Sequence, residues 1–177
     1  MLLTRFFSLW AVLVLTPLAL AGSFDEPLEK KVVDRGPDPR HHDEPGDPPS
    51  PHMKLSCYFF PTFMVKEHDS GEKGTDWLSI APLRPGDARV CEPTHGPGEQ
   101  MLESSGYFSG VSGDLVFVRD ADLFHGGMGF STFDSTTGKE LFHDSAEPLQ
   151  DPPYFRVDIS RDGGRLVLSY RRVVDGN

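Results

Sequence analysis

The sequence "FSTFDSTTGKELF", residues 130–142, contains the clearest signal of local structure in the chain. Apolar residues flank a polar centre, which begins at Asp134 and contains Gly138. Glycine adopts the positive φ that a tight turn requires, and aspartate accepts hydrogen bonds from the backbone of the turn. The stretch therefore predicts two short strands joined by a tight turn, which is a β-hairpin.

The same alternation of short apolar runs and polar turns continues over the rest of the chain from Lys54 onward. We expect strands within the runs 54–67, 77–83, 88–92, 113–120, 125–134, 140–145, 154–160 and 165–174. No stretch shows the 3.6-residue period of an amphipathic helix. The pattern predicts an all-β fold, a small antiparallel sandwich or barrel-like meander of about nine short strands, as a single β domain over residues 54–177.

Two of the predicted turns resemble repeat motifs of β-propellers. The D-x-x-T-G-K-x-x-W pattern of bacterial quinoprotein-type blades is matched at Asp134, Thr137, Gly138 and Lys139, with Phe142 in place of tryptophan. The S-P-D-G-x-x-L pattern of a second propeller repeat group is matched at Ser160, Asp162, Gly163 and Leu166, with Arg161 in place of proline. The resemblance implies blade-like hairpins. Each pattern occurs once, and a closed propeller needs about four blades of about 40–45 residues, so we predict hairpins within one small β domain.

The first 21 residues have the pattern of a secretory signal peptide. Arg5 precedes an apolar run over 6–15, Pro17 interrupts the run, and the small-residue pattern 19–21 predicts cleavage after Ala21. A membrane anchor is the alternative, but the run is short for the roughly 20 residues that a bilayer requires. We therefore expect a periplasmic or secreted protein with no membrane span after cleavage.

Residues 22–53 form a stretch of different composition. Seven prolines fall between residues 24 and 53, among many charges and few apolar side chains. Proline fixes φ and removes an amide donor, and a segment with few apolar residues cannot form a core. This composition predicts a disordered linker rich in proline, histidine and acidic residues, with the folded domain beginning near Lys54.

The net charge of the chain limits the classes of partner. The sequence holds 17 Lys and Arg residues and 27 Asp and Glu residues, for a formal net charge of −10. Nucleic acids and anionic membranes attract basic surfaces, so we expect neither as a partner. The charge is compatible with a basic protein partner, with cations, or with a merely solvated surface.

The chain has two cysteines, Cys57 and Cys91. In an oxidising compartment such a pair predicts a disulfide. It would close a loop of about 34 residues and stabilise the fold by roughly 3–4 kcal/mol on a loop-entropy estimate. A pair of metal ligands or a redox couple is the alternative interpretation.

Two groups of residues are candidate metal ligands. His41, His42 and His52 lie among acidic residues of the predicted linker, where imidazole and carboxylate groups hold transition metals weakly. Asp120, Asp122 and His125 lie in the stretch "RDADLFHGG", whose oxygens are candidate ligands for Ca²⁺ in a loop, although no Glu closes the loop as the EF-hand pattern requires. We expect no cofactor other than a weakly held divalent metal, and solvated polar residues are the alternative at both places.

The aromatic stretch "CYFFPTF", residues 57–63, offers a candidate binding surface. Alternate residues of a strand face opposite sides of the sheet, so one set belongs to the core. The other set, with Tyr58 and Phe60, either packs against a second layer or forms an exposed apolar patch that binds a ligand.

The sequence contains no recognisable catalytic constellation, and we expect a protein that is not an enzyme. The predicted function is an extracytoplasmic, non-catalytic binding module for a protein or glycan of the cell envelope, acting as an inhibitor or envelope accessory. The alternative is a secreted metal-binding protein that uses the linker histidines or the 120–125 loop.

Overall fold

The computed structural model describes residues 24–39, 50–71, 73–124, 126–150, 155–162 and 165–173. These residues form eleven β-strands and no helix, and every strand pair is antiparallel. The all-β prediction is thereby confirmed. The predicted signal peptide, residues 1–21, lies outside the described residues.

The strands form three sheets in which neighbours in the sequence are neighbours in space. The first sheet contains β1 (Glu29–Pro37), β2 (His52–Phe59), β3 (Phe63–Asp69), β4 (Trp77–Pro82) and β5 (Gln100–Met101). The second contains β6 (Tyr107–Ser112), β7 (Leu115–Phe124), β8 (Gly127–Asp134) and β9 (Glu140–Ala146). The third is the hairpin of β10 (Val157–Asp162) and β11 (Arg165–Tyr170).

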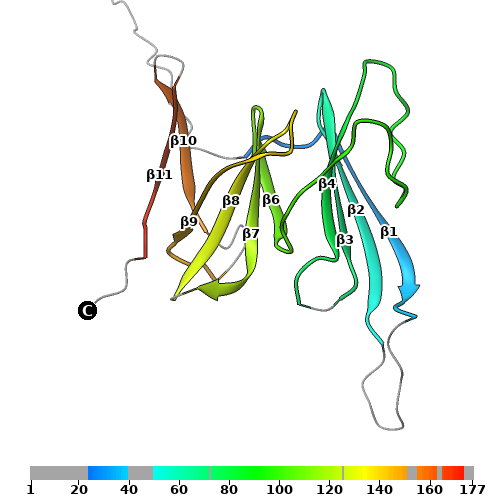
Figure 1. Ribbon diagram of the computed structural model, residues 1–177, viewed down its shortest axis with the longest axis horizontal. Coiled ribbons are helices and arrows are strands. Elements are labelled where there is room, and N and C mark those ends of the chain that lie inside the picture. The colour runs from blue at the N-terminus through cyan, green and yellow to red at the C-terminus, as the bar shows by residue number, and fades with distance from the viewer. Residues whose placement is uncertain are drawn as a thin grey trace, which may run out of the picture.

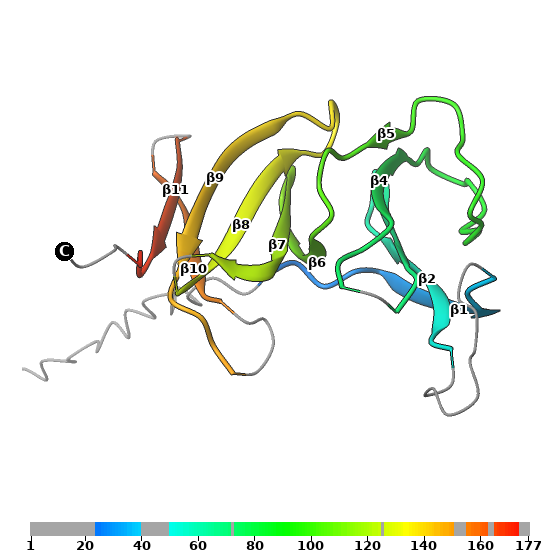
Figure 2. The same ribbon diagram turned by 60° about the horizontal axis from the view of Figure 1, so that its bottom comes forward.

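The three sheets stack face to face in chain order, as Figure 1 shows from right to left. The described strands form successive meanders and do not close into a ring or a barrel (Figure 2). The fold is therefore a layered meander of the sandwich type, one of the two architectures that the sequence predicts.

An apolar interface joins the first two sheets, and we call it the seam. Its buried side chains are Phe60, Phe63, Val65, Leu78, Ile80 and Leu102, with Val111, Val116, Val118 and Phe133 from the second sheet. Tyr58 and Phe108 pack against its edge with ring centroids 4.4 Å apart. Alternating apolar residues on β3 and β4 face the seam, so burial of this row fixes the register of both strands.

The binding surface predicted at Tyr58 and Phe60 is wrong, because both side chains belong to the seam. Phe60 is only 3 % exposed, and Tyr58 packs partly buried against the same cluster. The second sheet covers this face of β2, so the aromatic row is core. Cys57 and Phe59, on the opposite face, are completely buried as well.

The hairpin of β10 and β11 packs on the far face of the second sheet. Phe155 and Val157 are buried there against Phe117 and Phe130 of the second sheet. The Asp144 carboxylate of β9 also links the second sheet to the end of the hairpin. It accepts hydrogen bonds from the Tyr170 hydroxyl of β11 at 2.5 Å and from Arg172 Nε, just after β11, at 2.9 Å. Burial and the Asp144 carboxylate raise the pKa of Tyr170 to about 12.

The predicted disorder of residues 22–53 is wrong for the segment that contains β1. This strand pairs with β2 from Glu29 opposite Phe59 to Asp34 opposite Lys54. Proline is absent from the paired stretch until Pro37, where the register shifts. The folded chain therefore begins well before Lys54, and β2 itself begins at His52.

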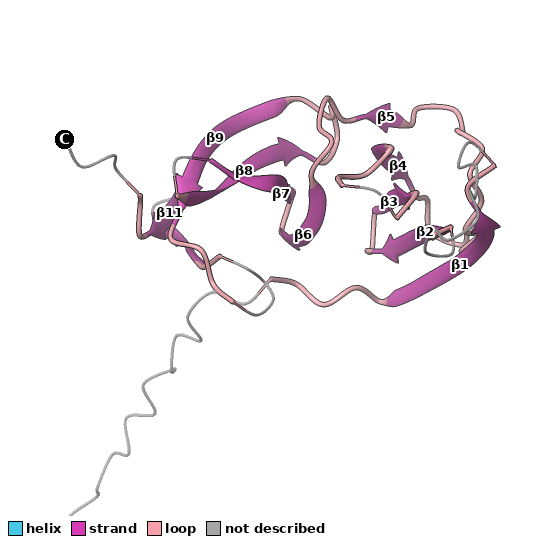
Figure 3. Cartoon of the chain, turned by 90° about the horizontal axis from the view of Figure 1, so that it is seen from below, coloured by secondary structure: helices cyan, strands magenta, loops and turns pink. Residues whose placement is uncertain are grey.

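The residues before β1 connect the sheets (Figure 3). Phe24 packs against Phe117 of the second sheet with ring centroids 5.1 Å apart, and the Asp25 amide donates to the Val111 carbonyl at 2.7 Å. The Leu28 amide donates to the Phe59 carbonyl of the first sheet, also at 2.7 Å. Backbone hydrogen bonds thus order a segment that few apolar side chains support.

The turn between β8 and β9 forms as the sequence predicts. Asp134 Oδ1 accepts from the Thr137 amide and hydroxyl, each at 2.8 Å, and these bonds lower the pKa of Asp134. Gly138 has φ +66°, in the left-handed region that favours glycine. The opening stretch of sequence is therefore a hairpin at one end of the second sheet.

Candidate functional site

The longest described connection is the stretch between β4 and β5, and we call residues 83–99 the 83–99 loop. It leaves the first sheet and folds back beside the sheet's outer face, opposite the seam (Figure 2). Most of its residues are exposed, and Val90 is 47 % exposed. The strand predicted at 88–92 is wrong, because this stretch carries no ladder pairing and is held by its side chains.

The first anchor of the loop is covalent. Cys91 of the loop is bonded to Cys57 of β2, with Cα atoms 5.7 Å apart. The predicted disulfide is thus confirmed. The bond lies in a small apolar cluster on the outer face, in which Leu83 of the loop also packs against buried Leu55 and Phe59.

The second anchor is a buried ion pair between the loop and the sheet. Lys66 Nζ of β3 lies 2.9 Å from Glu99 Oε1, and the two side chains are 3 % and 1 % exposed. The same ammonium donates to the Thr94 carbonyl of the loop at 2.8 Å. A buried pair is costly to desolvate and is compensated only by good geometry, so this anchor favours one loop conformation.

Glu99 is surrounded by hydrogen-bond donors. Its carboxylate accepts from the Ser79 hydroxyl, from His95 Nδ1 at 3.0 Å and from the Gly96 amide at 2.8 Å, in addition to Lys66. Burial alone raises the pKa of such a carboxyl group, but the four partners together lower the pKa of Glu99 to about 2. Glu99 is therefore a carboxylate at every physiological pH.

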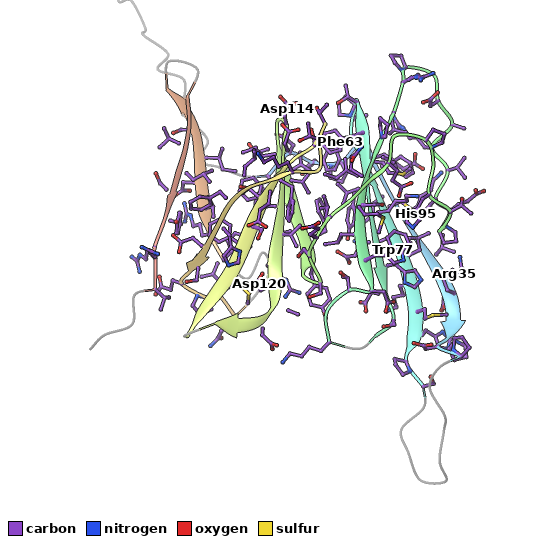
Figure 4. The ribbon with its side chains drawn as sticks, viewed as in Figure 1. Arg35, Phe63, Trp77, His95, Asp114 and Asp120 are labelled. Atoms are coloured by element: carbon purple, nitrogen blue, oxygen red, sulfur yellow. A yellow bond between two sulfur atoms is a disulfide. The ribbon has the colours of Figure 1, made fainter. Side chains whose placement is uncertain are left out.

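An aromatic contact also ties the loop to the sheet. The His95 ring meets the Trp77 ring of β4 edge-on at 4.8 Å, as Figure 4 shows for the two labelled residues. Trp77 also stacks on His68 of β3 with ring centroids 5.3 Å apart, and His68 Nδ1 donates to Asp76 Oδ2 at 2.8 Å. Trp77 therefore contacts one histidine of the sheet and one of the loop.

A further polar contact anchors the loop to β1. Lys31 Nζ donates to the Arg89 carbonyl at 2.5 Å, and Arg89 Nη1 lies 3.5 Å from Glu29 Oε2. The segment that the sequence assigns to a linker thus supports the loop. Sequence reasoning missed Lys66, Glu99, His95 and Lys31, because no motif connects residues that are distant in the chain.

A groove of about 440 Å³ separates the loop from the outer face of the sheet. Its floor contains Lys66 and Glu99. Apolar walls come from Met64, Ala81, Pro82, Val90 and Pro97. Exposed apolar side chains therefore stand beside a fixed polar network on the outer face.

The predicted residues Asp120 and Asp122 lie in a second groove, on the second sheet. This groove has a volume of about 410 Å³, and its other acidic residues and histidine are Glu103, Glu140 and His143. Both aspartates follow Arg119, where the β7–β8 register shifts, and Asp122 forms an ion pair with Lys73. The Asp120 carboxylate lies against Gly129, where a side chain would collide with it (Figure 4).

Of the predicted metal ligands, the structure describes His52, Asp120 and Asp122, and His52 does not lie with the two aspartates. Among the described residues, no group of three histidine, cysteine or acidic side chains is arranged to hold a metal ion. His52 lies 2.9 Å from Asp34 Oδ2 on the first sheet, away from Asp120 and Asp122 on the second. His41, His42 and His125 lie outside the described residues.

The chain has no counterpart in three comparisons with known proteins: no family model, no curated protein and no solved structure matches it. In the described part of the chain, no helix has the length and apolar character needed to cross a bilayer. The disulfide is compatible with an oxidising, extracytoplasmic compartment.

Proposed function

We propose that the protein is an extracytoplasmic, non-catalytic binding module whose contact surface is the 83–99 loop, and that its ligand is another protein of the periplasm or cell envelope. The main support for the proposal is that this loop is largely exposed and is nevertheless anchored to the sheet at several points. A disulfide, a buried ion pair and a lysine from β1 all hold it on the sheet.

Such an arrangement suits recognition of a protein for a thermodynamic reason. An unanchored loop of this length loses conformational entropy when it binds, and this loss reduces affinity. A loop that is already fixed avoids most of that loss. Val90, next to Cys91, supplies an exposed apolar side chain whose burial by a partner is favourable.

The experiment compares two matched substitutions. Immobilised wild-type protein, Val90→Asp and Leu141→Asp are each exposed to an envelope extract, and captured proteins are identified and titrated. Leu141, 54 % exposed on β9, is the control because its exposure is similar to that of Val90. We expect Val90→Asp to weaken capture at least about tenfold and Leu141→Asp to leave it unchanged.

Two outcomes contradict the proposal. One is that nothing binds specifically to the wild-type protein. The other is that a captured protein binds Val90→Asp as well as wild type, since its contact surface then lies elsewhere. Capture of a glycan instead of a protein would retain the binding role and change the class of ligand.

Metal binding is the second candidate function, and the groove around Asp120 and Asp122 favours it. Carboxylate oxygens are the ligands that Ca²⁺ prefers, and four acidic residues line this groove, although among the described residues they are not arranged as a coordination shell. If the groove binds Ca²⁺, millimolar Ca²⁺ raises Tm of the wild-type protein by mass action and does not raise Tm of Asp120→Asn. Equal Tm values with Ca²⁺ and with EDTA would remove this candidate.

A further inference from the structure

A second partly buried glutamate, Glu67, lies at the rim of the seam. Glu67 follows Lys66 on β3, so the two side chains point to opposite faces of the first sheet. Glu67 Oε2 accepts a hydrogen bond from the Phe108 amide of β6 at 2.7 Å. The carboxylate therefore bridges the first and second sheets directly.

The surroundings of Glu67 differ from those of Glu99. The Phe108 amide donates a hydrogen bond to the Glu67 carboxylate, whereas the Glu99 carboxylate has four partners. The charges of Lys30 on β1 and Arg119 on β7 favour the ionised form of Glu67. Their charged groups also contact aromatic rings, with Lys30 4.9 Å from the Tyr58 ring centre and Arg119 4.3 Å from that of Tyr107.

The balance of these groups disfavours the charged carboxylate. Burial raises the pKa of Glu67, and the neighbouring charge of Asp69 acts in the same direction. The Phe108 amide, Lys30 and Arg119 lower it, but the net direction is upward. Tyr58 on β2 faces the same place, and burial together with Glu67 raises the pKa of Tyr58 to about 12.

We infer that Glu67 is a pH-sensitive contact between the first two sheets, and that it makes the fold more stable in mildly acidic solution than at neutral pH. A carboxyl group whose pKa rises on folding stabilises the fold below its unfolded pKa, and that contribution disappears as the pH rises through its folded pKa. The protonated group still offers its carbonyl oxygen to the Phe108 amide, so the bridge persists while the desolvation cost of the charge is removed.

The test measures Tm between pH 4 and pH 8 for the wild-type protein, Glu67→Gln and Glu103→Gln. Glutamine retains the carbonyl acceptor and never ionises. We expect Glu67→Gln to match wild type near pH 4 and to exceed it near pH 7 by on the order of 3 °C. Glu103, an exposed glutamate, is the matched control, and Glu103→Gln should follow wild type throughout.

A carboxyl ¹³C titration of the wild-type protein provides a readout that needs no variant. The Glu67 signal should shift at a pH above the ordinary glutamate range. Inflection within or below that range, or a Tm difference between wild type and Glu67→Gln that does not change with pH, would overturn the inference. If Glu67→Gln fails to fold, the titration decides alone.

Discussion

The two faces of the first sheet are held in different ways. On the inner face, the seam is an apolar contact with another sheet, and Glu67 of β3 adds a polar bridge at its rim. On the outer face, the 83–99 loop is held by a disulfide, a buried ion pair and a lysine, with only a small apolar cluster beneath it. Burial of a continuous apolar row fixes the position of a paired strand. A long loop that has no such row needs individual side-chain anchors to hold one conformation.

The largest expected effect comes from the seam. Phe133 is 1 % exposed, so Phe133→Ala leaves a cavity between the sheets and should lower the free energy of unfolding by about 3–5 kcal/mol. Leu141→Ala, at an exposed position of β9, should cost less than about 0.5 kcal/mol. Urea denaturation of both variants measures the difference. A cost for Phe133→Ala no greater than that of the control would show that the seam is not the core.

The outer anchor should show the next largest effect. Glu99→Gln removes the charge that Lys66 neutralises, and a buried charge without its partner should cost about 3 kcal/mol in unfolding free energy. Lys66→Met combined with Glu99→Leu removes both charges and should recover most of that loss. Urea denaturation checks both values.

The fluorescence of Trp77 shows whether the loss of the ion pair displaces the loop. Trp77 contacts His95 of the loop and is one of two tryptophans, the other being Trp10 of the predicted signal peptide. Displacement of the loop in Glu99→Gln should therefore change Trp77 fluorescence, whereas Phe133→Ala should leave the folded-state emission unaltered. Unchanged emission in Glu99→Gln would mean that the ion pair does not position the loop.

The smallest expected effect is the difference between Glu99 and Glu67 in how their contributions to stability depend on pH. The pKa of Glu99 is lowered to about 2, so its contribution to stability is complete above the ordinary glutamate pKa near 4.5 and disappears as the pH falls toward 2. Glu67 has a raised pKa and therefore the opposite dependence. We expect the Tm difference between wild type and Glu99→Gln to be constant from pH 7 to pH 5 and to shrink only below about pH 4. A difference that shrinks between pH 7 and pH 5 would contradict this assignment.

The parts of the fold that follow local rules were predictable from the sequence. The hairpin at Asp134–Gly138 depends on an aspartate and a glycine within five residues, and the disulfide follows from having two cysteines in a chain with a predicted signal peptide. Both are confirmed. Local composition is sufficient there because the interacting groups are neighbours or are the only candidates.

The remaining features depend on distant contacts that composition does not reveal. Strand β1 forms because the backbone of β2 offers it a partner, although its own residues are mostly charged. Lys66 and Glu99 form an ion pair, although no sequence motif links them. Tyr58 and Phe60 pack in the seam because the second sheet covers that face of the first. The candidate binding loop therefore emerged from the structure and not from the sequence.

If its anchors hold the 83–99 loop as described, the loop is exposed and yet as rigid as the sheet beneath it. Backbone ¹⁵N relaxation of the loop amides measures this rigidity. We expect order parameters of about 0.85 for residues 86–96, equal to those of β3 and β4. Order parameters below about 0.6 across these residues would show a flexible loop, which the anchors described above do not allow.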